Sequence, residues 1–281
     1  MTMLDDLPET TKTMDTMEIG PARSLKTLTA LTEEERDEWV RRFLPAHFLA
    51  LYDIDLETFL NSEGERVVKH GGSPHTGEAW LSIWRRLSDR DPLLYGEARD
   101  TPNGQIELTF LATNDPDAPR FEVDTDGHGH STMLGKARRN IEAEIEAMNA
   151  GLAPGQVRKG LGLVLKEVIP HFERFLQALE HEFFFAYPLG YHNAILMERW
   201  GFDYLYGGAY MNELNERFQP GGDLYARLDG STPFRHPRAA ATVRGRSWAI
   251  HDGILGEPLE PIKLVKHLGH DSGISTFDGP Y

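Results

Sequence analysis

The spacing of apolar residues along the chain predicts amphipathic helices. A capping pair that starts at Thr32 precedes the apolar residues of 39–44, which follow at helical spacing. Segment 80–87 carries Trp, Ile, Trp and Leu at positions i, i+3, i+4 and i+7, which predicts a second helix. Residues 141–152 repeat apolar groups with the same period, and Gly151 is the residue type that commonly ends a helix.

Other stretches alternate apolar with polar residues and predict strands. Ile, Leu and Phe occupy every second position over 106–110, which is typical of a half-buried strand. Strand-like composition also occurs at 66–69, at 120–124, where a second strand would pair back on the first, and near 240–243 and 247–250. The mixture predicts an α+β fold: a mixed sheet with packed helices, a central helix-rich segment and an irregular C-terminal wrap.

Shifts in composition divide the chain into four predicted parts. Residues 1–28 contain few large apolar groups and are expected to form a loosely ordered arm. Residues 29–130 are expected to form an N-terminal α+β part, and residues 131–222 a central helical part. Residues 223–281 form an extension that is rich in Arg and His.

Charge and cysteine content narrow the classes of partner and site. The chain has 281 residues and no cysteine, and its 29 Lys and Arg residues stand against 44 Asp and Glu residues, a formal net charge of −15. Such a charge disfavours nucleic acid as a partner, and the lack of cysteine excludes disulfides and thiolate metal sites. The first residues lack a secretory pattern, and no run of about 18 apolar residues occurs. We therefore expect no membrane partner and a cytoplasmic location.

The residues that most suggest chemistry form a basic turn before a long, apolar-striped helix. Arg158 and Lys159 stand beside Gly160 and Gly162, where that helix is expected to begin. Glycines let the backbone approach a ligand closely, and the free N–H groups of a helix start favour an anion. The sequence therefore predicts an anion site. The alternative is that the glycines only let the helix pack closely on a neighbour.

Segment 151–206, which contains this turn, resembles the GNAT superfamily of acyl-CoA N-acyltransferases. In that family a basic, glycine-containing turn opens a helix and holds the pyrophosphate of CoA, and a strand, a short helix and a final strand follow. Residues 181–187 fit the first of these strands, the Met-Glu-Arg-Trp-Gly-Phe sequence at 197–202 is similar to the end of the short helix, and 203–206 fit the final strand. The resemblance implies an acyltransferase with an acyl-CoA donor bound at the turn.

The same resemblance directs attention to the short helix for a catalytic acid or base. Tyr191, His192 and Glu198 are the candidates there. Met197 occupies the place of the tyrosine that often protonates the departing thiolate, and Gly190 the place of the asparagine that usually opens this helix.

The family also has a strand directly before the phosphate-binding turn. In this chain, residues 136–150 predict a helix instead, with glutamates at every second position that a buried central strand would not tolerate. The element that precedes Gln156 therefore discriminates: a strand supports the resemblance, and a helix directly before Gln156, with no strand, would contradict the acyltransferase hypothesis.

A metal site is the second hypothesis. In the run Asp-Thr-Asp-Gly-His-Gly-His at 124–130, acidic and histidine residues alternate, so in an extended chain they would point the same way. The alternative there is a solvated turn. Helical carboxylates and histidines farther along could complete a site for iron or zinc. The candidate ligands are His128, His130, Glu144, His171 and His181.

The C-terminal extension contains a further basic cluster. Arg244 and Arg246 would lie on one face of an extended segment and could bind a carboxylate or phosphate. His251 could act as a base, although adjacent Asp252 is poorly placed to orient it, so a carboxylate from elsewhere would be needed. Internal salt bridges or a subunit contact are the alternatives for this cluster.

Aromatic residues are concentrated after the long helix. They could wall an apolar pocket for a small-molecule ligand, or they could simply form the core. A third hypothesis is thus a non-catalytic subunit or binding module, and a homo-oligomer, in which these surfaces make contacts. The residues are Phe184, Phe185, Tyr187, Tyr191, Trp200, Phe202, Tyr204 and Tyr206.

Overall fold

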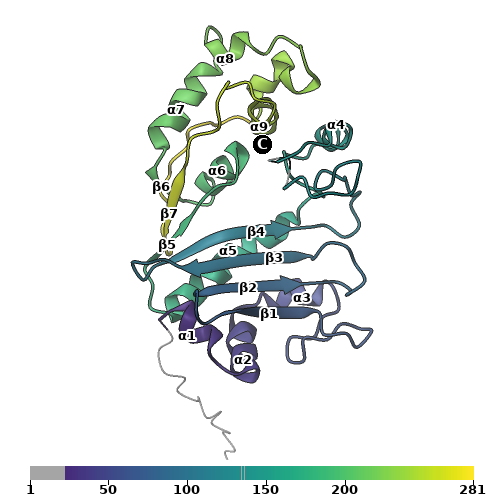
Figure 1. Ribbon diagram of the computed structural model, residues 1–281. Coiled ribbons are helices and arrows are strands. Elements are labelled where there is room, and N and C mark those ends of the chain that lie inside the picture. The colour runs from purple at the N-terminus through teal and green to yellow at the C-terminus, as the bar shows by residue number, and fades with distance from the viewer. Residues whose placement is uncertain (1–22, 134, 136) are drawn as a thin grey trace, which may run out of the picture.

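Seven strands form one mixed sheet, which confirms the predicted α+β fold (Figure 1). The computed structural model describes residues 23–133, 135 and 137–281, and the side chains of residues 163–165 lie outside this description. The order across the sheet is β1-β2-β3-β4-β5-β7-β6. The strands are β1 (Val68–Ser73), β2 (Glu78–Ile83), β3 (Leu94–Asp100), β4 (Ile106–Thr113), β5 (Phe183–Ala186), β6 (Asp203–Tyr206) and β7 (Lys263–His267).

Helices precede, interrupt and follow the strands. The α-helices are α1 (Leu25–Thr29), α2 (Glu33–Phe43), α3 (Ala46–Ala50), α4 (Ile141–Asn149), α5 (Gly162–Ala178), α6 (Tyr191–Glu198), α7 (Gly208–Arg217), α8 (Asp223–Ala226) and α9 (Val243–His251). Two 3-10 helices are η1 (Pro233–Arg235) and η2 (Pro237–Ala241). None of the helices in the described ranges is both long and apolar enough to cross a bilayer.

The sheet changes character between β4 and β5. Strands β1 to β4 form an antiparallel meander, and β5, β7 and β6 are also antiparallel to one another. By contrast, β4 and β5 are parallel, and α5 lies between them in sequence. They pair only from Ile106↔Phe184 to Leu108↔Ala186, so residues 109–113 of β4 continue without a β5 partner. Figure 1 shows β4 running on past β5 toward the segment that holds α4.

Helices α1, α2 and α5 cover one face of the meander. Trp39 and Phe43 of α2 stack with ring centroids 5.9 Å apart, and Phe175 of α5 meets Phe43 edge-on at 5.4 Å. One turn earlier on α5, Phe172 packs against Phe184 of β5 at 5.2 Å. These aromatic contacts join α2 to α5, and α5 to β5.

The segment between β4 and α5 packs on the C-terminal part of the chain. Its helix α4 shares an apolar cluster with α9 and η1, which contains Ala147, Leu152, Phe234 and Trp248. The indole Nε1 of Trp248 donates to the carbonyl oxygen of Leu152 at 2.8 Å. Because this segment touches α9, it links the β1–β4 half of the sheet to the helices that follow β5.

Several local predictions are confirmed. Thr32 and Glu35 make the reciprocal hydrogen bonds of a capping box at the start of α2. Strands occur at the predicted positions near 66–69 and over 106–110, and α4 occupies most of the predicted 141–152. The inward face of α4 is nevertheless smaller than expected, since Ala143, Glu144 and Ala147 are buried and Ile141 is exposed.

The helix predicted over 80–87 is wrong. Residues up to Ile83 belong to β2, which pairs with strands on both sides. Side chains alternate between the two faces of a strand, so Ala79, Leu81 and Ile83 share one face and Trp80, which is 38% exposed, lies on the other. Because Trp80 is a large apolar residue on the more open face of the sheet, the segment has apolar residues at helical spacing by coincidence. Pairing with two neighbouring strands makes it a strand.

Three predicted strands are also wrong, and part of the predicted arm is ordered. Residues 120–124 lie outside the sheet, while 240–243 and 247–250 fall within η2 and α9. Local strand-like composition did not decide their structure, because strand formation depends on pairing with a neighbouring strand. The arm was predicted over 1–28; residues 1–22 lie outside the described chain, but Leu25 begins α1 and is 1% exposed.

Candidate functional site

The basic turn lies against the carboxyl end of β4. The backbone N–H of Leu161 donates to Oγ1 of Thr113, the last residue of β4, at 3.2 Å. Next to it, the N–H of Asp115 donates to the carbonyl oxygen of Lys159 at 2.8 Å. Residues 114–159 therefore form an excursion that leaves β4 and returns to the same point before α5 begins.

The element that precedes Gln156 in the sequence is not the element that lies next to the turn in space. In sequence it is the helix α4, as the glutamate pattern predicted, with no strand in the described residues between it and Gln156, and this is the outcome that counts against the resemblance. In space, the strand next to the turn is β4, which runs into it through the contacts of Thr113. The chain thus has the strand–turn–helix arrangement with the excursion, α4 included, inserted between strand and turn.

Two glycines of the turn have different surroundings. A Cβ on Gly160 would lie 2.9 Å from Oγ1 of Thr113, so only glycine permits this approach to β4. A Cβ on Gly162 would meet no atom within 4 Å. Packing therefore does not require glycine at position 162. Glycine is also unfavourable there, because it lowers helix stability by up to about 1 kcal/mol relative to alanine.

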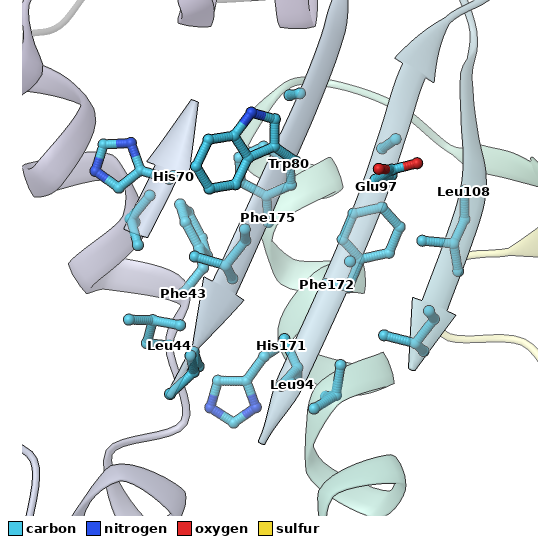
Figure 2. A pocket seen from close by; sticks show the side chains of 18 of the residues that line it. Phe43, Leu44, His70, Trp80, Leu94, Glu97, Leu108, His171, Phe172 and Phe175 are labelled. Carbon is cyan, nitrogen blue, oxygen red and sulfur yellow. The ribbon is translucent and has the colours of Figure 1, made fainter. Parts of the chain in front are cut away.

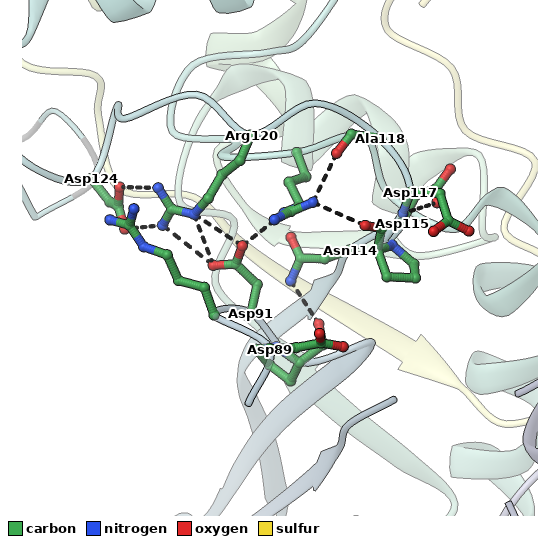
Figure 3. Close-up of polar contacts among 12 residues, drawn as sticks. Asp89, Asp91, Asn114, Asp115, Asp117, Ala118, Arg120 and Asp124 are labelled. Atoms are coloured by element: carbon green, nitrogen blue, oxygen red, sulfur yellow. Dashed lines mark hydrogen bonds and ion pairs between the residues drawn. The ribbon is translucent and has the colours of Figure 1, made fainter. Parts of the chain in front are cut away.

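Arg158 is held by the protein itself, at the Asp91 carboxylate that Figure 3 shows bound to Arg120. Its Nε donates to Asp91 at 2.8 Å, and a second nitrogen donates to the carbonyl oxygens of Pro116 and Ala118. The same Asp91 carboxylate accepts hydrogen bonds from Arg120. The predicted CoA ligand Arg158 is therefore part of a structural network.

Arg120 is the most strongly bound member of that network. Burial acts to lower the pKa of its guanidinium, but hydrogen bonds to Asp124 and Asp91 outweigh burial and raise the pKa. Both carboxylates lie within 3.0 Å of a guanidinium nitrogen. The network fixes the excursion to the loop between β2 and β3, and so fixes the position of the turn.

Lys159 is the free cation of the turn. Its side chain is exposed, and among the described residues no carboxylate lies within ion-pair distance of it. It lines a pocket of about 180 Å³ at the start of α5. The pocket is lined by Phe48, Leu51, Tyr52, Asp115, Lys159, Gly160, Leu161, Gly162 and Glu167.

Tyr191 and Glu198 of α6 are buried and fully engaged. Glu198 is 3% exposed and accepts hydrogen bonds from the hydroxyl of Tyr204 and from the N–H and Oγ1 of Thr276, the last two at 2.9 and 2.6 Å. The hydroxyl of Tyr191 accepts a long hydrogen bond of 3.4 Å from Arg246. Burial raises the pKa of Tyr191. In this structure both side chains fasten α6 to the C-terminal part.

His192 forms a buried pair with a residue that the sequence did not single out. Its Nδ1 lies 2.7 Å from Oγ of Ser247 on α9, and both residues are buried. Burial, helped by the charges of His251 and Arg244, lowers the pKa of His192 to about 3. The imidazole is therefore neutral at physiological pH. No sequence motif links the two residues, which lie 55 positions apart.

His251 is oriented by a distant carboxylate, as its predicted role as a base required. Its Nε2 lies 3.2 Å from Oε1 of Glu144 on α4, and Arg139 pairs with the other oxygen. Asp252 is turned away and binds Arg139 and Arg235. Burial acts to raise the pKa of Glu144, but the hydrogen bonds of His251 and Arg139 outweigh it and the pKa is lowered.

Arg244 and Arg246 do not share an exposed face. The extended geometry assumed for this pair is wrong, because both lie on the helix α9, where residues two apart diverge. Arg246 is 1% exposed, donates to Ala240 and Asn215, and stacks on the ring of Phe277. The Arg244 guanidinium lies over the ring of the C-terminal residue, Tyr281, at 4.7 Å.

The five candidate metal ligands lie at separate positions. His128 and His130 occupy an exposed turn, Glu144 binds Arg139, His171 bonds to the carbonyl of its own helix, and His181 lies by Arg23. Within the described ranges, no three His, Asp or Glu residues are grouped in a way that could hold a metal ion.

The aromatic residues divide between core and surface. Phe184, Tyr191 and Phe202 are fully buried and belong to the main core. Tyr187 and Tyr206 pair at the edge of the sheet with ring centroids 6.5 Å apart. The pocket at the turn is lined by a different aromatic pair, Phe48 and Tyr52 of the N-terminal part, and sequence spacing gave no sign of their proximity.

Comparison with protein-family models, with curated proteins and with solved structures gives no match. The geometry of the turn, the pocket and the parallel strands is therefore what bears on function.

Proposed function

We propose that the protein is a GNAT-like acyltransferase that binds an acyl-CoA donor at the turn before α5. One observation carries the proposal: after the long excursion, the chain returns to Thr113, so that β4, the basic glycine turn and α5 are adjacent in space. The order that follows, β5, α6 and β6, is the order that the resemblance predicted.

The parallel pair supports the same location. In sheets with parallel strands, ligands bind outside the carboxyl ends of the strands, at the point where the connections diverge. The carboxyl ends of β4 and β5 lie at Thr113 and Ala186. Helix α5 begins beside the end of β4, after the excursion, and α6 follows β5 in the sequence. Because β4 and β5 separate after Leu108, the intervening edge of β4 carries backbone groups that no β5 residue pairs with.

The turn has the groups that a pyrophosphate needs. Helix α5 has no side-chain N-cap, so its first N–H groups point out of the helix without a capping acceptor. Gly162 leaves open space in front of them, and Lys159 adds a positive charge. We assign pyrophosphate binding to Lys159 and to the N–H groups of Gly160 and Gly162, since the N–H of Leu161 is bound to Thr113. We remove Arg158 from this role because Asp91 holds it.

Two carboxylates in the pocket limit the strength of this site. Asp115 and Glu167 both line it and repel an anion. Binding therefore depends strongly on the backbone donors and on the single lysine. This makes Lys159 the most informative position for a charge reversal.

The test is calorimetric titration of the full chain with acetyl-CoA. We expect wild type to bind, and Lys159→Glu to lose at least about tenfold in affinity, the effect of one strong charge-assisted contact. Lys69→Glu, an exposed lysine on the edge strand β1, is the matched control and should bind like wild type. Absence of binding by wild type, or equal losses in both variants, would contradict the proposal.

Turnover distinguishes a transferase from a binding module. In acyl transfer the amine nitrogen attacks the thioester carbonyl, the C–N bond forms, the C–S bond breaks, the amine releases a proton and CoA leaves as the thiol. The chain contains no cysteine, so a thiol reagent detects released CoA without a background from the protein. Amine-dependent thiol release is expected; binding with no release from any of a broad set of amines would favour the binding module.

A further inference from the structure

A second cavity lies beneath the helical layer, away from the turn. It has a volume of about 170 Å³ and is enclosed by α1, α2 and α5 on one side and by the face of β1 to β4 on the other. Figure 2 shows Phe43 and Leu44 of the α2 end, Phe172 and Phe175 of α5, and Leu94 and Leu108 of the sheet around it.

Small residues on the sheet create this cavity. Ala79 of β2 pairs with Ala98 of β3, and Gly96 lies two residues before Ala98 on the same face. A Cβ on Gly96 would meet only Leu111, at 3.8 Å, so the position has room for a side chain. Protein cores are normally close-packed. A glycine with free space above it in a central strand therefore indicates that the space has a use.

The cavity suits an apolar chain. Apart from a few polar residues, its lining consists of aliphatic and aromatic side chains. An engineered apolar cavity of about 150 Å³ stays dry and binds benzene, so a cavity of this size and lining accepts hydrocarbon in preference to water.

One cation on the lining, Arg36, has a buried donor without an acceptor among the described residues. The Nε of Arg36 is buried and makes no hydrogen bond within the described part of the chain, and no carboxylate there lies within ion-pair distance of its guanidinium. One terminal nitrogen donates to the carbonyl oxygens of Leu31 and Thr29. A buried donor without an acceptor is unfavourable, and more so on a charged group.

The other polar residues of the lining are already satisfied. His70 bonds to Asp37 at 2.6 Å, and His171 bonds to the carbonyl oxygen of Glu167 at 2.7 Å. Glu97 lies on the opposite face of β3 by strand alternation and accepts a hydrogen bond from Tyr95. Arg36 is thus the group that a ligand would satisfy.

We propose that this cavity binds a linear monocarboxylate, with its hydrocarbon tail between the sheet and α5 and its carboxylate on the Nε edge of Arg36. A carboxylate matches the guanidinium fork and supplies the acceptor that Nε lacks. The tail fills the space over Gly96. This site is independent of the CoA site, since the two share no lining residue.

Octanoate is the probe, with 1-octanol as its uncharged counterpart, and binding to the full chain is measured by calorimetry. Arg36→Met keeps the apolar stem of the side chain and should lower octanoate affinity about tenfold or more while changing octanol affinity little. Arg42→Met, on the exposed face of the same helix, is the matched control and should bind both ligands like wild type.

Gly96→Val tests the tail site without threatening the fold. Valine is favoured in strands and has space here, so the variant should melt at a higher temperature than wild type and yet bind neither ligand. Undiminished octanoate binding by Gly96→Val would overturn the proposal. So would equal losses of octanoate and octanol in Arg36→Met, or the failure of wild type to bind octanoate.

Discussion

Two cavities of nearly equal volume lie against α5, and they differ in almost everything else. The cavity under the helical layer, about 170 Å³, is mainly apolar, and the Nε of Arg36 on its lining makes no hydrogen bond within the described part of the chain. The pocket at the start of α5, about 180 Å³, is bordered by backbone N–H groups, an exposed Lys159 and two carboxylates. Volume alone would not separate them.

The difference lies in what each cavity leaves unsatisfied. In the apolar cavity, the lining side chains have no apolar group to contact across the open space, and one buried N–H has no acceptor among the described residues. Both features match a ligand with a long tail and a small anionic head. In the turn pocket, several N–H groups face outward from a helix start, which matches a larger, more highly charged anion. We therefore expect that octanoate does not bind in the turn pocket and that acetyl-CoA does not bind in the apolar cavity.

The largest effect is expected from Asp91→Ala. This substitution should affect only the turn pocket, because it removes contacts that position the turn and none that line the apolar cavity. Asp91 holds both Arg158 and Arg120, and leaving partly buried cations without their carboxylate should lower the free energy of unfolding by about 3 kcal/mol. Urea unfolding measures this. In the folded variant, acetyl-CoA affinity should fall and octanoate affinity should not.

Asp117→Ala is the control for that change. Asp117 pairs with Arg85 on the surface, so its loss should lower the free energy of unfolding by less than about 1 kcal/mol. Equal effects of the two substitutions would contradict the role given to Asp91.

Acid should lower the free energy of unfolding through the protonation of His192. This loss of stability limits the pH range in which ligand binding at the two sites can be compared. The pKa of His192 is about 3 in the folded protein and near 6.5 when unfolded, so the unfolded chain binds more protons between these values. The free energy of unfolding should therefore fall by about 1.4 kcal/mol per pH unit as the pH drops below 6.5.

Urea unfolding at pH 7 and pH 5 measures this contribution. His192→Gln removes the titration and should make the acid dependence shallower, whereas His47→Gln, on an exposed position of α3, should leave it unchanged. An unaltered slope in His192→Gln would show that another group causes the acid dependence.

Thr113→Val tests whether β4 positions the turn. Valine has the shape of threonine but cannot accept the N–H of Leu161, so the free energy of unfolding should fall by about 1 kcal/mol. Acetyl-CoA affinity should fall severalfold, while octanoate affinity stays constant. Thr113→Ser retains the hydroxyl and should behave like wild type; acetyl-CoA affinity that is the same in all three proteins would contradict the role of this contact.

The smallest effect should be a gain. Asp115→Asn removes a negative charge from the turn pocket but keeps the oxygen that accepts the N–H of Asp117. Acetyl-CoA affinity should rise about two- to fivefold, in line with an exposed charge pair. Calorimetry measures it, and a fall in affinity would mean that the anion does not approach Asp115.

Local signals in the sequence predicted the elements whose stability is decided locally. The capping box at Thr32, the helix stop at Gly151 and the order of elements from β5 to β6 all depend on neighbouring residues. Strand β2 was mistaken for a helix because its identity depends on β1 and β3, which pair with it from elsewhere in the sequence.

The candidate site shows the same division. The glycines and cations of the turn were visible in the sequence, but the contact of Leu161 with Thr113 spans 48 residues and left no pattern. For the same reason Arg158 looked available, although Asp91, 67 positions earlier, holds it. Hydrogen bonds between distant residues decide which cation of a motif remains free.

The most direct test of the central claim is a CoA titration of the isotope-labelled full chain, followed by amide chemical shifts in NMR. We predict that the amides of Lys159, Gly160 and Gly162 shift most, and that those of Arg36 and Gly96 stay in place. Turn amides that do not move at saturating CoA, or shifts confined to another part of the chain, would contradict the account.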